Sequence, residues 1–433
     1  MELEKQTLRR ITVRLVPFLI VCYFIAYLDR VNVGFAALSM NRDLGLSQTA
    51  YGLGAGIFFF TYFLFEVPSN LFLAKFGARK WIARIMFTWG ILSGAMAFVQ
   101  GEWSFYVVRA LLGVAEAGFF PGIIFYLTLW FPASYRARIL GYFMAAIPLS
   151  SVLGLPVSGG LLGMDGVGGL HGWQWLFIIE AVPALILSVV VFFYLTDRPA
   201  DAAWLPAENR TWLMQRIAAE EQVRTTAEHF SVGQALVNGR VLALSLVYFG
   251  VVASLYGLSF FLPQIVRQFG VTTLQNSFIS AVPFAIGVVA SLTWGRLSDQ
   301  TGNRKGLTAA SLLLIAIGVG AAAMIDDPLL KMVAFCVAAF GIFGTLAVFW
   351  TLPTSFLSGM AAAGGIAVIN SIGNLAGFAG PYAMGAIKDA TNSYQGGLIM
   401  LSGLALVAML IVLMLRHDRH LEAVPVMTAV AAE

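Results

Sequence analysis

Two adjacent charged residues, Asp29 and Arg30, lie in an otherwise apolar stretch of the sequence, YLDRVNVGFA (27–36). A charged side chain near the centre of a bilayer costs from about 2.5 to more than 10 kcal/mol, depending on how the cost is measured. Charges kept at such a cost usually mark a transport path or a coupling site. We therefore expect the rest of the chain to hold Asp29 and Arg30 near the middle of a membrane.

A second charged pair, Arg109 and Glu116, lies in the apolar stretch RALLGVAEAGFFPG (109–122). At about 1.5 Å per helical residue, Asp29 lies about 22 Å beyond Arg14, and Glu116 lies about 18 Å into its helix from the opposite side. The two carboxyl groups are therefore predicted at similar depths. Arg109 precedes Glu116 by about two turns and is expected on the same helix face.

These four charged groups could act as a proton switch. An arginine keeps its charge, whereas a carboxylate in an apolar site can bind a proton when it exchanges partners. With Asp29 and Glu116 ionised the four charges cancel, and with both protonated the arginines attract an anion. The alternative is a permanent salt-bridge cluster between the first and fourth helices, in which Arg109 only orients Glu116. Ion pairs buried for packing alone are a weak source of stability, so their number here favours a functional role.

The second half of the chain has no charged residue at predicted mid-membrane depth, but two of its segments are rich in uncharged polar residues. These are TLPTSFLSG (351–359) and INSIGNLAGFAGP (369–381). Uncharged donors suit the oxygens of a small acid, and Asn370 and Asn374 share one helix face because they are four residues apart. The alternative is that small and polar residues hold helices together. The candidate ligands are Thr351, Asn370, Ser371 and Asn374.

Aromatic residues are candidates for the wall of a cavity, although in membrane proteins they more often pack or form interfacial belts. The candidates are Tyr27, Tyr62, Tyr256 and Trp350. Two further acids, Glu66 and Glu180, are expected to be structural or to pair near a membrane surface.

The composition indicates an integral membrane protein. Of 433 residues, 59% are hydrophobic and 11% are charged, whereas a soluble domain has about 25% charged residues. The net charge of +4 fits basic loops between spans better than nucleic-acid binding. Both cysteines lie in apolar runs and the histidines lie in loops or the tail, so we expect no metal site. The glycine runs precede no GK[ST] motif, and no nucleotide or other cofactor is expected.

The apolar segments predict an all-α membrane protein with twelve transmembrane helices in two six-helix bundles, at about 20 residues per span. We expect residues 1–195 to form the N-terminal bundle, 196–240 a cytoplasmic linker with an amphipathic surface helix, and 241–433 the C-terminal bundle with a short cytoplasmic tail. The expected spans are 15–36, 50–73, 82–100, 104–130, 138–162, 174–195, 241–266, 275–297, 306–325, 329–352, 363–387 and 394–415.

The basic residues predict the orientation of these spans. Cytoplasmic loops carry the excess of Lys and Arg. Placing the N-terminus inside puts 20 of the 26 Lys and Arg residues on the cytoplasmic side. Both termini are therefore expected in the cytoplasm.

Two loops at equivalent places in the halves resemble each other, NLFLAKFGARK (70–80) and GRLSDQTGNRK (295–305). The second loop resembles the signature of the major facilitator superfamily. Its matching residues are Gly295, Leu297, Asp299, Gly302, Arg304 and Lys305. The first loop keeps Gly77, Arg79 and Lys80 but has Asn70 and Ala74 where Gly and Asp are expected. Such repeats let one half rock against the other about a central site.

Together with the stretches 27–36 and 109–122 and with FFFTYFLFEVPSN (58–70), these loops make the chain similar to the anion:cation symporter family. Within that family it most resembles permeases of the tartrate, phthalate or hydroxyphenylacetate type. The resemblance implies proton binding by Asp29 and Glu116 and substrate binding by Arg30. It also supports Asn374, Tyr27 and Tyr62 as residues that shape selectivity.

The expected function is proton-coupled import of a small organic carboxylate by alternating access, in a monomer of a bacterial cytoplasmic (inner) membrane. The expected partners are the organic anion, protons and the lipid bilayer. Organic anion exchange is the alternative, and a transporter-like receptor or a membrane enzyme is a remote one. An enzyme would need a nucleophile with a base or a metal set, and no His or reactive Cys is placed for this.

Overall fold

The computed structural model describes residues 2–225, 237–356 and 359–415, and these form a bundle of long helices. The first half comprises α1 (Glu2–Asp43), α2 (Gln48–Phe76), α3 (Ala78–Ala95), α4 (Glu102–Glu116), α5 (Phe119–Trp130), α6 (Ala133–Leu162) and α7 (Gly172–Tyr194). The second half comprises α10 (Gly239–Arg267), α11 (Thr273–Thr301), α12 (Arg304–Met324), α13 (Pro328–Phe349), α14 (Thr351–Phe356), α15 (Gly359–Thr391) and α16 (Gln395–Met414).

Eleven segments of the described chain are long and apolar enough to cross a membrane, with α4 and α5 joined as one and α13 and α14 joined as another. The further long helix α15 contains the predicted span 363–387 and packs between α2 and α10. Together they form the expected two six-helix bundles, and the all-α membrane fold is confirmed.

The predicted spans 104–130 and 15–36 show clear differences from the structure. The span 104–130 is broken after Glu116, because Ala117 leaves the helical region and Gly118 adopts φ 84°. The first helix is far longer than 15–36, since α1 continues through the polar residues at both of its ends. At the N-terminal end helical geometry persists because Glu2–Arg14 contains neither glycine nor proline.

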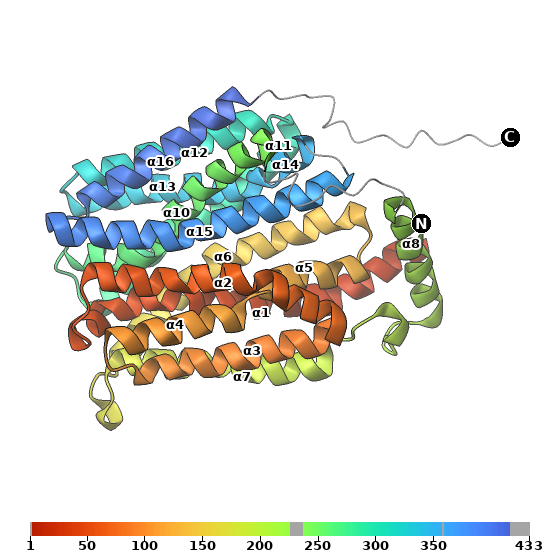
Figure 1. Ribbon diagram of the computed structural model, residues 1–433, viewed down its shortest axis with the longest axis horizontal. Helices are drawn as coiled ribbons and strands as arrows, with labels where there is room; N and C mark the ends of the chain where they lie inside the picture. Colours follow the sequence, from red (N-terminus) through yellow and green to blue (C-terminus); the bar gives the residue numbers. More distant parts are fainter. Residues whose placement is uncertain (1, 226–236, 357–358, 416–433) are drawn as a thin grey trace.

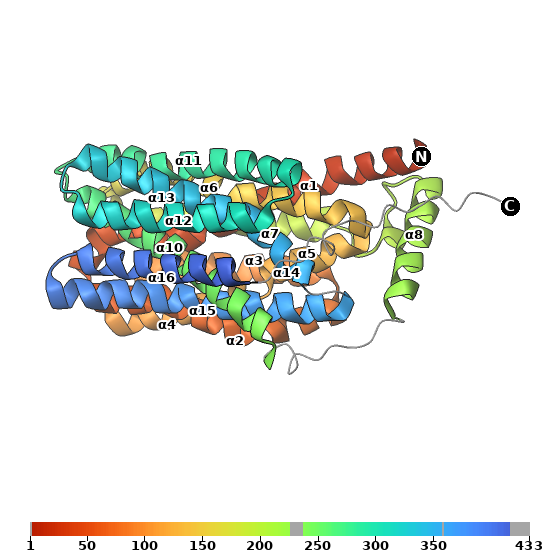
Figure 2. The ribbon, with the colours of Figure 1, turned by 90° about the horizontal axis from the view of Figure 1, so that it is seen from above.

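The linker between the halves carries the predicted surface helix, α8 (Ala207–Thr225). This helix lies across one end of the bundle, where α1 begins (Figure 1, Figure 2). Asn209 of α8 donates to the Thr7 hydroxyl at 2.6 Å and accepts from Arg10 at 3.3 Å. We call this end of the molecule the α8 end. The division at residues 195 and 240 stays a prediction.

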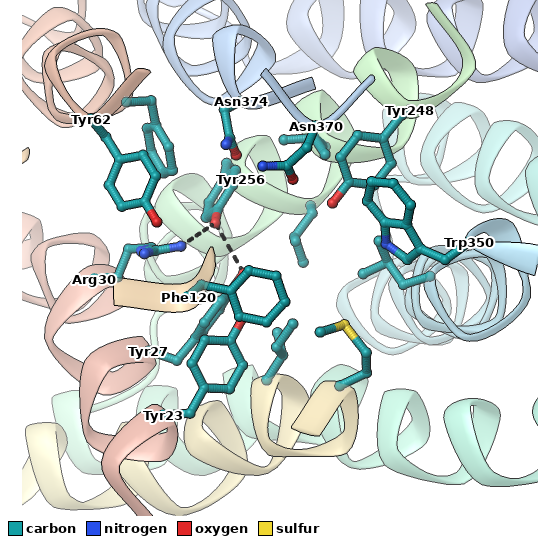
Figure 3. Close-up of a pocket in the computed structure, with 16 residues that line it drawn as sticks. Tyr23, Tyr27, Arg30, Tyr62, Phe120, Tyr248, Tyr256, Trp350, Asn370 and Asn374 are labelled. Atoms are coloured by element: carbon teal, nitrogen blue, oxygen red, sulfur yellow. Dashed lines mark hydrogen bonds between the residues drawn. The ribbon is translucent and has the colours of Figure 1, made fainter. Parts of the chain in front are cut away.

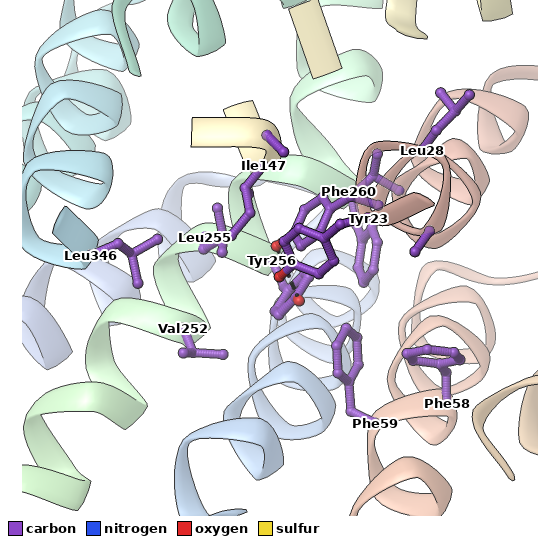
Figure 4. Packing of buried hydrophobic residues seen from close by; sticks show 14 of the residues in the cluster. Tyr23, Leu28, Phe58, Phe59, Ile147, Val252, Leu255, Tyr256, Phe260 and Leu346 are labelled. Carbon is purple, nitrogen blue, oxygen red and sulfur yellow. Dashed lines mark hydrogen bonds between the residues drawn. The ribbon is translucent and has the colours of Figure 1, made fainter. Parts of the chain in front are cut away.

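The two halves pack through α2 against α15, α6 against α11 and α1 against α10. The approach is tightest away from the α8 end. A Cβ added at Gly34 of α1 would lie 2.6 Å from the Ser259 carbonyl oxygen of α10, and one at Gly56 of α2 would lie 2.8 Å from the Phe378 carbonyl oxygen of α15. Only glycine permits such backbone contact. Towards the centre, aromatic and aliphatic side chains such as Phe59 and Tyr256 meet across the interface (Figure 4).

The two signature-like loops turn sharply at the α8 end. Gly302 ends α11 with φ 63°, and Lys305 donates to the carbonyl oxygens of Leu413 and Leu415 at 2.8 and 2.6 Å. In the first loop Gly77 has φ 90°, and the backbone N–H of Arg79 donates to Asp197 at 2.8 Å.

The role of these loops in conformational change stays a prediction. Of the residues predicted for this role, Gly295 and Asp299 lie in α11, Arg304 begins α12, and Lys80 lies in the first turn of α3.

Candidate functional site

A cavity of about 60 Å³ lies between the two halves near the middle of the bundle (Figure 3). It has room for a few water molecules. The first half contributes Tyr23, Tyr27, Arg30, Phe59, Tyr62, Phe120, Met144 and Ile147. The second half contributes Tyr248, Val252, Leu255, Tyr256, Leu346, Trp350, Asn370 and Asn374. Half of these lining residues are aromatic, and one of them carries a permanent charge.

That charge is the Arg30 guanidinium, which connects the halves. Arg30 forms a salt bridge with Glu116 and donates to the Tyr256 hydroxyl of α10 at 3.3 Å. Its guanidinium carbon lies 5.4 Å from the ring centroids of Tyr27 and Tyr62, within the range of cation–π attraction. Its Nε is buried without a hydrogen-bond partner among the described residues, so the guanidinium has donor capacity left for a ligand.

Glu116 is the last residue of α4 and is 1% exposed. Its place at the end of α4 follows from the helix break at Ala117 and Gly118. A Cβ at Gly118 would lie 2.5 Å from the Ser69 hydroxyl of α2, so the broken segment can pack this closely on α2 only with glycine at that place.

The other two charged candidates do not join this pair. Asp29 points to α3, where it accepts a hydrogen bond from the Trp89 indole at 2.7 Å, and its Oδ1 has no hydrogen-bond partner among the described residues. Arg109 donates to the carbonyl oxygens of Gly54 and Ala55 in α2 at 3.2 and 2.9 Å. The structure therefore brings Arg30 and Glu116 together and leaves Asp29 and Arg109 at separate places in the first half.

Most uncharged candidates surround the cavity. Tyr27 donates to the Tyr256 hydroxyl at 3.1 Å, and Asn370, Asn374 and Trp350 line the side of the second half. Thr351, the first residue of α14, donates to the Val348 carbonyl in the last turn of α13. Neither Thr351 nor Ser371 is among the described residues that line the cavity.

With this geometry known, comparison with known proteins identifies the family. Residues 19–381 and 244–426 match the Major Facilitator Superfamily. The chain belongs to this superfamily. It is 56% identical over 417 residues to a protein of Agrobacterium vitis named "Putative tartrate transporter", covering 96% of this chain and 93% of that one. It is 44% identical over 403 residues to a "Quinolone resistance transporter" of Acinetobacter baumannii, covering 93% of each chain.

Among solved structures, the inward open conformation of the xylose transporter XylE from E. coli superposes with a TM-score of 0.75 at 16% identity, covering 95% of this chain and 98% of that one. This likeness shows the fold. The chain is thus a multi-pass membrane transporter of the Major Facilitator Superfamily and not an enzyme.

Nine of the sixteen residues that line this facilitator's cavity were not among the predicted site residues, and three of them, Tyr23, Phe120 and Tyr248, are aromatic residues in contact with other ring systems of the wall. Tyr23 stacks on Phe120 at 5.2 Å between ring centroids, and Tyr248 contacts the Trp350 ring at 4.8 Å. A pattern in the sequence could have found Tyr23, since Tyr23, Tyr27 and Arg30 follow the four- and three-residue spacing of one helix face. No comparable signal marks Phe120, because the helix break before it changes the face that it presents.

The two acids expected to be structural have different surroundings. Glu180 accepts from Asn32 at 3.0 Å and from Ser158 at 2.6 Å, all inside the first half. Glu66 instead accepts from Asn370 of the second half at 3.2 Å. The sequence contained no indication of this contact between the halves.

Proposed function

We propose that this facilitator imports a small hydroxy-carboxylate, of which tartrate is the type, together with protons, by alternating access. The names of the 56% and 55% identical relatives support the substrate class. The membrane in question is the bacterial cytoplasmic (inner) membrane. The α8 end faces the cytoplasm, supported by the 20 of 26 basic residues expected there. The carrier acts as a monomer.

The single observation that carries the proposal is the position of Arg30. It is a permanent cation in a cavity between the halves, its counter-ion is the buried Glu116, and it retains an unused donor at Nε. When Glu116 binds a proton, Arg30 loses its partner and can hold a substrate carboxylate through a charge-assisted hydrogen bond. When the substrate leaves, Glu116 releases the proton and pairs with Arg30 again.

The surrounding residues would divide the remaining tasks. Tyr27, Tyr62 and Tyr256 enclose Arg30, whereas Asn370, Asn374 and Trp350 would meet the hydroxyl and second carboxylate groups of the substrate. Asp29 would serve as a further proton site behind the cavity, and Arg109 would support the α2–α4 contact. Thr351 and Ser371 would act from outside the cavity wall. Because the cavity has room for only a few waters, substrate binding must accompany an opening of the halves.

Uptake by proteoliposomes tests the proposal. An inward proton gradient should drive accumulation of tartrate, and Arg30→Gln should weaken tartrate binding by at least about 10-fold, because a hydrogen bond to a charged group contributes about 1.5–3 kcal/mol. Arg42→Gln, at the far end of the same helix, is the matched control and should behave as wild type. Transport that ignores the pH gradient but is strongly stimulated by tartrate on the opposite side would contradict proton symport and favour exchange.

A further inference from the structure

Glu66 is a carboxylate beside the cavity for which the mechanism above has no use. It lies in α2, one turn after Tyr62, which lines the cavity, and is 8% exposed. Its Oε1 accepts a hydrogen bond from the Asn370 amide of α15 at 3.2 Å, and Asn374 lies on the same side. Its Oε2 is buried without a hydrogen-bond partner among the described residues.

No cation is paired with Glu66 in the described part of the chain. From α1 the charge of Arg30 acts on Glu66, but Arg30 is already paired with Glu116. Tyr62 of α2 and Tyr248 of α10 are the titratable neighbours, and a phenol carries no charge at neutral pH.

The other arginines of the neighbouring helices have partners elsewhere. Arg84 of α3 stacks on the Trp81 ring at 3.9 Å, and Arg109 of α4 bonds to the backbone at the other end of α2. An ionised Glu66 is therefore an uncompensated negative charge beside a site proposed for anions.

We infer that Glu66 is a second proton-binding residue of the cavity, linked to substrate binding. This inference rests on the proposed function. With Arg30, Glu116 and Glu66 all charged, the site has a net charge of −1 and repels an anion. A proton on Glu66 removes that charge and leaves the Asn370 amide free to turn from Glu66 to a substrate oxygen. Glu66 thus occupies the amide when the substrate is absent, and the substrate replaces it.

The replacement of Glu66 by the substrate explains how a site with one arginine can bind a substrate with two negative charges. Protonating Glu116 alone leaves Arg30 opposed by Glu66 and a net charge of zero. Protonating both acids leaves a net charge of +1, so each bound tartrate takes up two protons at these positions. The count concerns the cavity only and leaves Asp29 aside.

Binding of tartrate to purified protein, measured by titration calorimetry between pH 6 and pH 8.5, tests the inference. Each proton taken up on binding changes the Kd by about tenfold per pH unit. Glu66→Gln keeps a hydrogen-bonding group of the same size. It should bind tartrate more tightly than wild type at pH 8. Its Kd should also depend less on pH, by about a factor of ten per pH unit compared with wild type. The pH dependence of the Kd of Glu66→Ala should be reduced by the same factor.

Two further variants distinguish proton binding by Glu66 from a purely structural contact between Glu66 and Asn370. Asn370→Ala removes the contact between the halves but keeps the carboxyl group, so its Kd should rise while its pH dependence stays that of wild type. Glu102→Gln changes an exposed acid and is the control. If Glu66→Gln has the wild-type pH dependence, or binds more weakly at every pH with unchanged slope, the inference is wrong.

An experiment without ligand distinguishes this inference from the proposed function. Infrared difference spectra of the lipid-embedded protein between pH 5.5 and pH 8.5 should contain a carboxyl C=O band that Glu66→Gln loses and Glu102→Gln keeps. An unchanged band in Glu66→Gln overturns the inference whether or not tartrate binds. Failure of wild type to bind tartrate would instead contradict the proposed substrate class. The infrared band would then show by itself whether Glu66 binds a proton.

Discussion

At the scale of single residues, the charges of the first half divide into two environments. Arg30 lines the cavity and pairs with the buried Glu116, whereas Asp29 faces α3 and the Trp89 indole. Asp29 and Arg30 are adjacent, so they point about 100° apart around the α1 axis. One residue can thus contact the substrate while its neighbour acts only through the interior of the bundle.

This separation predicts the effect of Asp29→Asn. The substitution removes the proposed proton site without touching the cavity wall, so proton-driven accumulation of tartrate should be lost while the Kd for tartrate stays within about threefold of wild type. Uptake and calorimetry on the same preparation measure the two effects. Normal accumulation against a gradient by this variant would refute the role of Asp29, and a large rise in Kd would contradict its position outside the site.

At the scale of the elements, the break between α4 and α5 positions Glu116. The hydropathy pattern alone predicts one helix over 104–130, since glycine within a membrane helix is common. The break exists because Gly118, at φ 84°, lets α5 pack on Ser69 of α2. A tertiary contact has therefore overridden the local helical preference.

Gly118→Ala tests the importance of this break. A left-handed conformation costs a non-glycine residue about 1–2 kcal/mol, and the added methyl group would press on Ser69. The melting temperature should fall, and tartrate binding should weaken because Glu116 moves relative to Arg30. Gly160→Ala is the matched control, since a Cβ there meets nothing within 4 Å. Equal melting temperatures and affinities for the two variants would contradict this role for the break.

At the scale of the whole molecule, the halves are joined most closely at the end opposite α8. Asp389 of α15 accepts hydrogen bonds from the backbone N–H groups of Gln48 and Thr49 at 3.1 and 2.6 Å, and from the Thr49 hydroxyl at 2.6 Å. Partial burial raises the pKa of the Asp389 carboxyl, but these hydrogen bonds outweigh it and hold the pKa below its ordinary value of 3.8. A lowered pKa means that the contact is fully present above that value and is lost only as the pH falls below it.

Asp389→Ala should therefore favour opening at that end, and equally so at pH 5.5 and pH 8. Spin labels at Trp103 and Leu329, which are 80% and 73% exposed, with both native cysteines replaced, would report the distance between the halves. Longer distances than in the wild-type background are expected. Unchanged distances would mean that Asp389 does not hold the halves together, and a shift confined to one of the two pH values would contradict the lowered pKa.

The sequence by itself determined the membrane class and the approximate spans, and it marked Arg30 as a candidate, because hydropathy, charge bias and motifs are local properties of the chain. Helix periodicity also assigned Asn370 and Asn374 to one face. Only the tertiary structure decided that Arg30 pairs with Glu116 but not with Asp29, that α4 ends at Glu116, and that Glu66 meets Asn370 across the halves. The physical reason is that periodicity specifies the face of a helix on which a residue lies, whereas the packing of the whole bundle selects the helix that covers that face.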